Sequence, residues 1–326
     1  MSKSRRKHLW QSLNLIDLSQ TLHKEGFGFL YAMQILDGKQ ASNYYQEQLK
    51  AESLEFEAKT GKKPHLAAIL VGNSGPSETY VAAKMETCRK VGFQSSLIRF
   101  EPTITEQQLL LEIDKLNQDS DLHGFIVQLP LPAHIDVNKV IERVDPSKDV
   151  DGFHPVNLGK MAKGLPAFAS ATPWGIIKLM EYYNIETEGK HVVVLGRSQI
   201  VGLPMSLLLS RNSKPGNATV TVCHSKSQNL ADISRQADIL VAALGIPEFV
   251  KKEMVKDGAI VIDVGLSRIP DETRKSGYRL VGDVAYDEVA PKCSAITPVP
   301  GGVGPMTITA LMQNTLLAAR QQMGLT

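Results

Sequence analysis

The chain has 326 residues, about twice the length of a typical single domain, so two hydrophobic cores are expected. Its formal net charge of +2 argues against a strong preference for nucleic acid or membranes, and neither partner is expected. Three isolated cysteines, Cys88, Cys223 and Cys293, argue against a disulfide framework and a cysteine-based metal site. We therefore expect a protein of a reducing compartment, the cytoplasm.

The first 32 residues differ from the rest of the chain. They begin with the basic run MSKSRRKHLW, but the stretch that follows is broken by charged residues and lacks the apolar core of a signal peptide. No apolar run in the sequence approaches the roughly 20 residues needed to span a bilayer. We interpret residues 1–32 as a dispensable extension, because the regular pattern begins at Met33.

Residues 33–170 predict a parallel α/β domain. The unbroken apolar run 66–72 is typical of a strand buried on both faces. Ser77 is expected to cap a helix that reaches Val91. A capping box of Thr105 and Gln108 predicts the start of a second helix. Two further strands are predicted, at 95–100 and 124–132. This β-α-β-α-β order gives a parallel sheet through right-handed crossovers.

Residues 171–306 predict a second domain of the Rossmann type. Thr172 as N-cap and Pro173 at the first helical position begin a helix. A last helix from Thr307 has no following strand to cover, so we expect residues 307–326 to pack back onto the first domain. The fold class is therefore α/β, with two domains. The remaining predicted elements are strands at 191–196, 218–223, 238–245 and 258–265, and helices centred near 206, 232 and 254.

The first strand of the second domain runs into the loop GRSQIVG at 196–202 and then into a helix. A Rossmann fold lays pyrophosphate against such a helix N-terminus. Ser198 stands where the fingerprint has its second glycine, and the loop is one residue longer, so the motif also fits a glycine-rich turn without a ligand. The strand-helix alternation around the loop favours a dinucleotide site.

The next strand ends in CHSK at 223–226, where an NAD enzyme usually carries an acidic residue. Ser225, Lys226 and Arg197 would instead accept an anionic 2′-phosphate, which favours NADP over NAD. The alternative is that the two cations are solvated surface charges. Cys223 has a neighbouring histidine but no third or fourth ligand nearby, so no metal is expected.

Four polar residues of the first domain are candidates for chemistry. Tyr80 and Lys84 are four residues apart and project from one helix face. Gln128 and Asp151 are expected beyond the carboxyl ends of the strands, where open parallel sheets bind ligands. Each residue also has a purely structural interpretation: a helix surface for the first pair, a sheet-edge polar residue for Gln128, and a tight turn for Asp151.

Six segments resemble the bifunctional methylenetetrahydrofolate dehydrogenase/cyclohydrolase family. They occur in family order and spacing from about Met33 onward: SETYVAAK (77–84), GFIVQLPLP (124–132), PSKDVDGF (146–153), GRSQIVGLP (196–204), VIDVGLSR (261–268) and ITPVPGGVGPMT (296–307). QLPLP and PVPGGVGPMT are far more specific than a glycine-rich loop. The departures are few: residues 1–32 have no counterpart, Ala171 replaces a cysteine of some members, and the loop 210–218 is longer than in some relatives.

The resemblance implies NADP-dependent oxidation of 5,10-methylenetetrahydrofolate to the 5,10-methenyl compound, and hydrolysis of that compound to 10-formyltetrahydrofolate. It implies that Lys84 is the principal catalytic residue, that Tyr80 positions the folate, that Gln128 interacts with Lys84, and that Asp151 binds the pterin ring. The resemblance also implies tetrahydrofolate derivatives as partners and a cytoplasmic homodimer. Further contacts are implied for folate at Leu129, Pro300 and Gly301, and for NADP at Gly196, Arg197, Ser198, Ile200, Val201, Ser225 and Leu266.

The chemistry of the two steps agrees with these residue types. Loss of a hydride mainly requires positioning, whereas hydrolysis requires a group that moves protons, and a lysine serves when burial and a folate cation lower its pKa. Two other interpretations remain. Another NADP dehydrogenase of similar layout, such as one like shikimate dehydrogenase, would lack QLPLP and PVPGGVGP. A non-catalytic folate- or nucleotide-binding module would be marked by loss of Lys84, Gln128 or Asp151.

Overall fold

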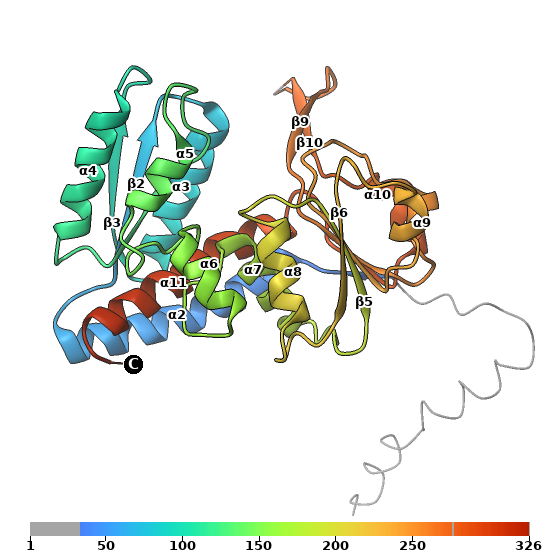
Figure 1. Cartoon of the computed structure of the whole chain (residues 1–326), viewed down its shortest axis with the longest axis horizontal. Helices are drawn as coiled ribbons and strands as arrows, with labels where there is room; N and C mark the ends of the chain where they lie inside the picture. The colour runs from blue at the N-terminus through green and yellow to red at the C-terminus, as the bar shows by residue number, and fades with distance from the viewer. Residues whose placement is uncertain (1–32, 276, 326) are drawn as a thin grey trace, which may run out of the picture. The chain divides into compact units, whose positions relative to one another are not determined.

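The computed structural model describes residues 33–275 and 277–325. The extension predicted at residues 1–32 lies outside them. Within the described residues the chain builds two parallel sheets, each flanked by helices, together with a two-stranded hairpin (Figure 1). The predicted α/β class is confirmed.

The first sheet has the order β3-β2-β4 and is entirely parallel. Its central strand β2 is buried along its whole length, as its unbroken apolar run predicts. Leu66, Ala68 and Leu70 pack toward α3 and α11, while the alternate side chains pack toward α4. The elements of this half are β2 (His65–Val71), α3 (Gly75–Lys90), β3 (Gln94–Phe100), α4 (Glu106–Gln118), β4 (Gly124–Val127), α5 (Val137–Arg143) and α6 (Pro155–Ala162).

Two predicted boundaries in this half are wrong. Helix α3 begins at Gly75 with Ser74 as N-cap, not at residue 77, because Pro76 fits the first turn. Strand β4 ends at Val127 rather than at residue 132, so Gln128 lies beyond the ladder. The capping box of Thr105 and Gln108 is confirmed.

The second sheet has the order β1-β11-β8-β7-β5-β6, and all its pairs are parallel. The four predicted strands are β5 to β8. Strand β1, which precedes the first sheet in the chain, pairs with β11 and so joins the second sheet. The strands are β1 (Gln34–Ile35), β5 (His191–Leu195), β6 (Thr219–Cys223), β7 (Ile239–Ala242), β8 (Ile260–Asp263) and β11 (Ala295–Ile296), with the hairpin β9 (Ser267–Pro270) and β10 (Tyr278–Val281).

The helices of the second half correct three predictions. Helix α7 (Ala171–Tyr182) takes Ser170 rather than Thr172 as N-cap. The helix expected near 254 is a single 3-10 turn, Lys252–Met254. The last helix, α11 (Val303–Gln322), begins four residues before Thr307. The remaining helices are α2 (Gly38–Thr60), α8 (Gly202–Ser210), α9 (Leu230–Ser234), α10 (Tyr286–Val289) and the 3-10 turn Ala290–Lys292.

Helix α11 returns to the first half, as predicted. It packs along α2 and α7 and also contacts α3, β2 and β4 (Figure 1). Asn314 in its middle donates to Val150 O (2.8 Å) and Ala169 O (2.9 Å). Since both carbonyls flank the Asp151 turn, α11 fixes the position of that turn.

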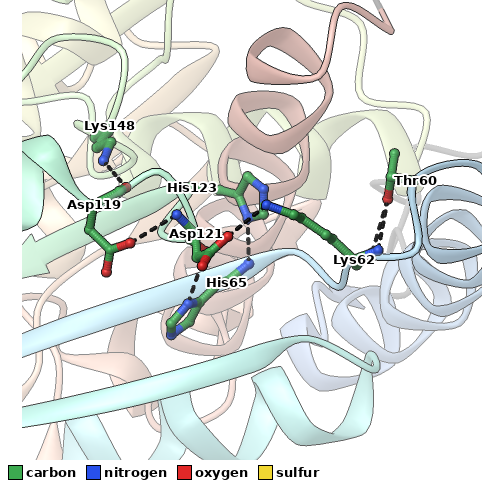
Figure 2. Close-up of polar contacts among 7 residues, drawn as sticks. All are labelled: Thr60, Lys62, His65, Asp119, Asp121, His123 and Lys148. Carbon is green, nitrogen blue, oxygen red and sulfur yellow. Dashed lines mark hydrogen bonds and ion pairs between the residues drawn. The ribbon is translucent and has the colours of Figure 1, made fainter.

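The amino ends of β2 and β4 are joined by a polar network around two histidines (Figure 2). The backbone N–H of His65 donates to His123 Nδ1 (3.0 Å), and His65 Nδ1 lies 3.1 Å from Asp121 O. Gln322 of α11 donates to His123 O (2.7 Å). The last helix is thereby tied to the sheet edge opposite the carboxyl ends of the strands.

Within the ranges that the structure describes, no helix combines the length and the apolar character needed to cross a membrane. In the same ranges no three histidine, cysteine, aspartate or glutamate side chains gather as a metal site would require. The three cysteines are buried and unbridged.

Candidate functional site

Lys84 is the centre of a buried polar cluster. Its side chain is only 7% exposed, and Nζ donates to Gln128 Oε1 (3.1 Å). The amide of Gln128 in turn donates from Nε2 to Leu129 O (2.8 Å). That second bond points Oε1 at the lysine, so the residue that follows β4 orients the amino group.

Lys84 and Asp151 influence each other's charge. Burial lowers the pKa of Lys84, and the carboxylate of Asp151 opposes that shift. Burial likewise raises the pKa of Asp151, and Lys84 opposes it. The two groups are therefore electrostatically coupled, and the charge of each depends on that of the other.

The turn that carries Asp151 is held rigidly on both sides. Asp149 accepts from the backbone N–H groups of Phe153 (3.1 Å) and His154 (2.8 Å). Gly152 has φ +69°, and a Cβ there would meet the backbone at Ala169 at 2.6 Å, so glycine is required. Asp151 is thus set by backbone geometry rather than by its own side-chain bonds.

A cleft of about 800 Å³ lies beside this cluster. Its walls come from α2, α3, the start of α11 and the loops after β8 and β11. Tyr80 stands in the wall one helical turn before Lys84, and burial raises the pKa of its phenol. Five of the predicted site residues share this cleft: Tyr80, Val201, Leu266, Pro300 and Gly301.

The other predicted residues lie outside the lining of the cleft. Leu129 and Asp151 border a separate small cavity of about 20 Å³ against β4. Lys84 is buried, and Gln128 is half-buried. Gly196, Arg197, Ser198, Ile200 and Ser225 lie on the loops that follow β5 and β6.

Several cleft residues went unpredicted. Helix α2 presents a polar face to the cleft at the helical spacing 39, 42, 43 and 46, a pattern that could have indicated it. Ser42 Oγ lies 2.8 Å from Thr309 Oγ1, which joins this face to α11. Thr172, Asp263 and Thr307 also line the cleft.

The glycine-rich loop after β5 departs from the Rossmann fingerprint for a physical reason. Ser198 Oγ accepts from the backbone N–H groups of Val201 (3.2 Å) and Gly202 (3.4 Å), so its hydroxyl closes the turn at the helix start. Gly196 has φ +115°, and a Cβ there would collide with the carbonyl of Ala243. A serine therefore takes the place of the second glycine without opening the loop.

The loops after β5 and β6 lie side by side, because Gly196 N donates to Cys223 O (2.9 Å). Arg197, Ser225 and Lys226 are all exposed there. Among the ion pairs of residues 33–275 and 277–325, none involves Arg197 or Lys226. This end of the sheet combines uncompensated positive charge with a hydroxyl.

Both halves of the chain match models of one protein family. Residues 36–151 match the tetrahydrofolate dehydrogenase/cyclohydrolase catalytic domain, and residues 170–323 match the NAD(P)-binding domain of the same family. A relative from Phocaeicola vulgatus, named bifunctional protein FolD, is 61% identical over 289 residues, which cover 89% of this chain and 99% of that protein. A relative of the same name from Porphyromonas gingivalis is 58% identical and covers 88% and 97%.

Solved structures give the same result. The bifunctional FolD methylenetetrahydrofolate dehydrogenase/cyclohydrolase of Campylobacter jejuni is 45% identical with a TM-score of 0.83, covering 89% of this chain and 99% of that one. The Trypanosoma brucei enzyme, solved with NADP cofactor and an inhibitor, is 37% identical with a TM-score of 0.84, covering 89% and 98%. This chain therefore belongs to the tetrahydrofolate dehydrogenase/cyclohydrolase family.

Proposed function

We propose that this chain oxidises 5,10-methylenetetrahydrofolate with NADP and then hydrolyses the 5,10-methenyl product to 10-formyltetrahydrofolate. The observation that carries the proposal is the buried amino group of Lys84 beside the cleft. Gln128 accepts a hydrogen bond from this amino group, and the carboxylate of Asp151 acts on its pKa. Family membership supports the same pair of reactions.

The proposal divides the work between two domains. Residues 33–170, with 307–326, bind the folate, and residues 171–306 bind NADP. Tyr80 packs against the folate and sets its position, while Leu129, Pro300 and Gly301 make further contacts. The carboxylate of Asp151 accepts from the two N–H groups at the aminopyrimidine edge of the pterin ring.

Oxidation requires no strong base. NADP, when bound, supplies the hydride acceptor. The chain contributes position: Tyr80 and the wall formed by residues 300–301 hold the methylene carbon within reach and exclude water. Lys84 has no proton to move in this step.

Hydrolysis requires proton transfer at one carbon. Water adds to the methenyl carbon, and the neutral amine of Lys84 takes the proton that the water loses. The hydroxyl proton then leaves as the carbon becomes a formyl group, the bond to N5 breaks, and N5 gains a proton. The lowered pKa of Lys84 keeps part of the population in the neutral form that this step needs.

The residues at the ends of β5 and β6 fit NADP. The side-by-side loops offer Ser225, Lys226 and Arg197 to a 2′-phosphate, and no acidic residue stands in the sequence 223–226. Gly196, Ser198, Ile200, Val201 and Leu266 make the remaining contacts with the cofactor.

An absorbance assay tests the proposal. Methylenetetrahydrofolate with NADP should yield reduced cofactor and a methenyl intermediate, and methenyltetrahydrofolate alone should disappear faster than in buffer. A protein that binds folate but turns over neither substrate would instead be a binding module.

The proposal also places the enzyme in the cytoplasm as a homodimer. Light scattering should give twice the mass of one chain. A mass equal to one chain at working concentration would refute the proposed dimer but not the proposed reactions.

A further inference from the structure

Two buried carboxylates stand at the carboxyl end of the second sheet. Asp263 ends β8 and is 3% exposed, and Asp283 follows β10 and is fully buried. Each accepts hydrogen bonds from three backbone N–H groups. Burying a carboxylate is costly unless hydrogen bonds compensate it, and here three backbone amides compensate each one, so each carboxylate fixes the backbone that surrounds it.

Asp283 holds the loop that follows β7. Its Oδ2 accepts from the backbone N–H groups of Leu244 (2.5 Å) and Gly245 (2.9 Å), and its Oδ1 accepts from Ile246 (2.9 Å). Three consecutive amides thus point at one carboxylate. The loop shape is therefore set by a residue almost forty positions away in the chain.

Asp263 holds two further segments. Its Oδ1 accepts from Gly265 N (2.9 Å) and from Asp283 N (2.9 Å), and its Oδ2 accepts from Val284 N (2.9 Å). Because the backbone amide of Asp283 donates to Asp263, the two residues belong to one continuous hydrogen-bond network. They connect the loops after β7 and β8 to residues 282–284.

Two glycines make room for this arrangement. A Cβ on Gly265 would collide with the carboxylate of Asp283, and a Cβ on Gly282 would collide with that of Asp263. Neither glycine has positive φ, so close approach rather than backbone conformation requires them. We call Asp263, Asp283 and the amides that they accept the carboxylate clamp.

We infer that Asp263 and Asp283 are positioning residues for the dinucleotide, which they serve by fixing the loops after β7 and β8. The inference rests on the proposed NADP site. In an open parallel sheet the ligand binds beyond the carboxyl ends of the strands, where these loops lie. Residues 264–266, which Asp263 anchors, line the cleft directly.

The test is Asp283→Asn, which keeps the shape of the side chain but turns an acceptor into a donor facing an amide. The KM and Kd for NADP should rise about tenfold, the loss expected for one hydrogen bond to a charged group. Hydrolysis of supplied methenyltetrahydrofolate needs no cofactor and should stay within twofold of wild type. Asp271→Asn is the matched control, since that carboxylate also accepts a backbone N–H, from Thr273, but in the hairpin turn.

The outcomes separate the two claims. Unchanged NADP affinity in Asp283→Asn would overturn the clamp while leaving the proposed function intact. Equal loss of both activities would show a purely structural role and would also overturn it. Absence of NADP binding by the wild type would refute the proposed function itself, and the clamp's role with it.

A measurement on the wild type covers the case in which the variant does not fold. The amides of residues 244–246 lie in a loop, yet the clamp should protect them from hydrogen exchange before any cofactor is added. Protection of these three amides, with a further increase on adding NADP, is the expected result. Exchange at the rate of exposed amides would overturn the inference.

Discussion

In the proposed mechanism Lys84 moves a proton only in the hydrolysis, so it is the residue at which the two activities should separate. Lys84→Met keeps most of the side-chain length but removes the amine. Cyclohydrolase activity should fall about 100-fold or more, because proton transfer is lost, while dehydrogenase activity falls far less. Methenyltetrahydrofolate should then accumulate in the coupled assay. Arg89→Met, exposed on the same helix, is the control, and an equal loss of both activities would refute the proton-transfer role.

In the proposed mechanism the charge of Asp151 tunes the same step. Its carboxylate raises the pKa of Lys84 against the lowering effect of burial. In Asp151→Asn only burial remains, so the pKa of Lys84 falls further and the neutral amine persists to lower pH. The acid limb of the cyclohydrolase pH profile should therefore shift to lower pH, and the folate KM should rise. A limb that stays in place would mean that Asp151 acts only in binding.

The proposed phosphate pocket predicts that cofactor choice depends on Ser225. Ser225→Asp places a carboxylate where it repels a 2′-phosphate and can accept from a 2′-hydroxyl. The ratio of kcat/KM for NADP over NAD should fall at least about tenfold. Ser225→Asn, uncharged and of the same size, should move the ratio much less. A wild-type enzyme that reduces both cofactors equally well would already contradict the phosphate pocket.

Among the elements, α11 connects the Asp151 turn to the body of the protein. Asn314→Leu removes the donor that satisfies the carbonyls of Val150 and Ala169. Burying two unpaired carbonyls should cost about 1–3 kcal/mol in the free energy of unfolding, and the folate KM should rise because the turn loosens. Urea denaturation measures the first effect. Gln321→Leu on the exposed end of α11 is the control, and an equal loss there would exclude the proposed anchor.

Elements with a clear local signal were predictable from sequence, whereas the two-residue strands and the 23-residue helix α2 were not predicted. The apolar run of β2 and the capping box of α4 carry local signals that the structure bears out. Strands β1 and β11 have two residues each, too few for a period, and only their remote pairing makes them strands. The start of α3 was misplaced because Ser74 and Ser77 are equally good capping residues on local evidence.

At the scale of the whole molecule, the sequence predicted the site in separate pieces. Tyr80 and Lys84 could be assigned to one helix face, and Gln128 to the end of a strand. The helical spacing of the polar residues of α2 indicates a polar face but not what that face meets. That partner, and the cleft position of Asp263, could not be assigned, because they depend on how α2, α11 and the loop after β8 pack. Long-range packing of this kind leaves no local pattern.

The global response to acid should be sensitive to one histidine. His123 is 1% exposed, and its Nδ1 accepts from the backbone N–H of His65, a role that only the neutral ring can fill (Figure 2). Burial lowers its pKa from 6.5 to about 4. The nearby charges of His65, Lys62 and Lys148 act in the same direction, and that of Asp121 opposes them. The unfolded chain therefore binds a proton at higher pH than the folded chain does.

The sign of the effect follows from linkage. Above about pH 6.5 His123 is neutral in both states, and as pH falls toward 4 only the unfolded state gains the proton, so stability is lost over that window. The loss should reach about 2 kcal/mol after allowance for solvent screening. Burial raises the pKa values of Asp149 and Asp263 to about 7, which acts in the opposite sense over the same range. The prediction therefore concerns a difference between variants rather than the wild-type profile alone.

His123→Asn isolates that difference, because its Oδ1 can accept from His65 N–H but does not titrate. The variant should be less stable than the wild type at pH 7, since the ring also packs edge-on against Phe56 at 5.8 Å between centroids. Between pH 6.5 and 4, however, its free energy of unfolding should fall by about 2 kcal/mol less than that of the wild type, as measured by urea denaturation. His134→Asn, at an exposed histidine, is the control, and its free energy of unfolding should depend on pH as that of the wild type does. The same pH dependence of the free energy of unfolding in His123→Asn and the wild type would show that His123 does not resist protonation in the folded state.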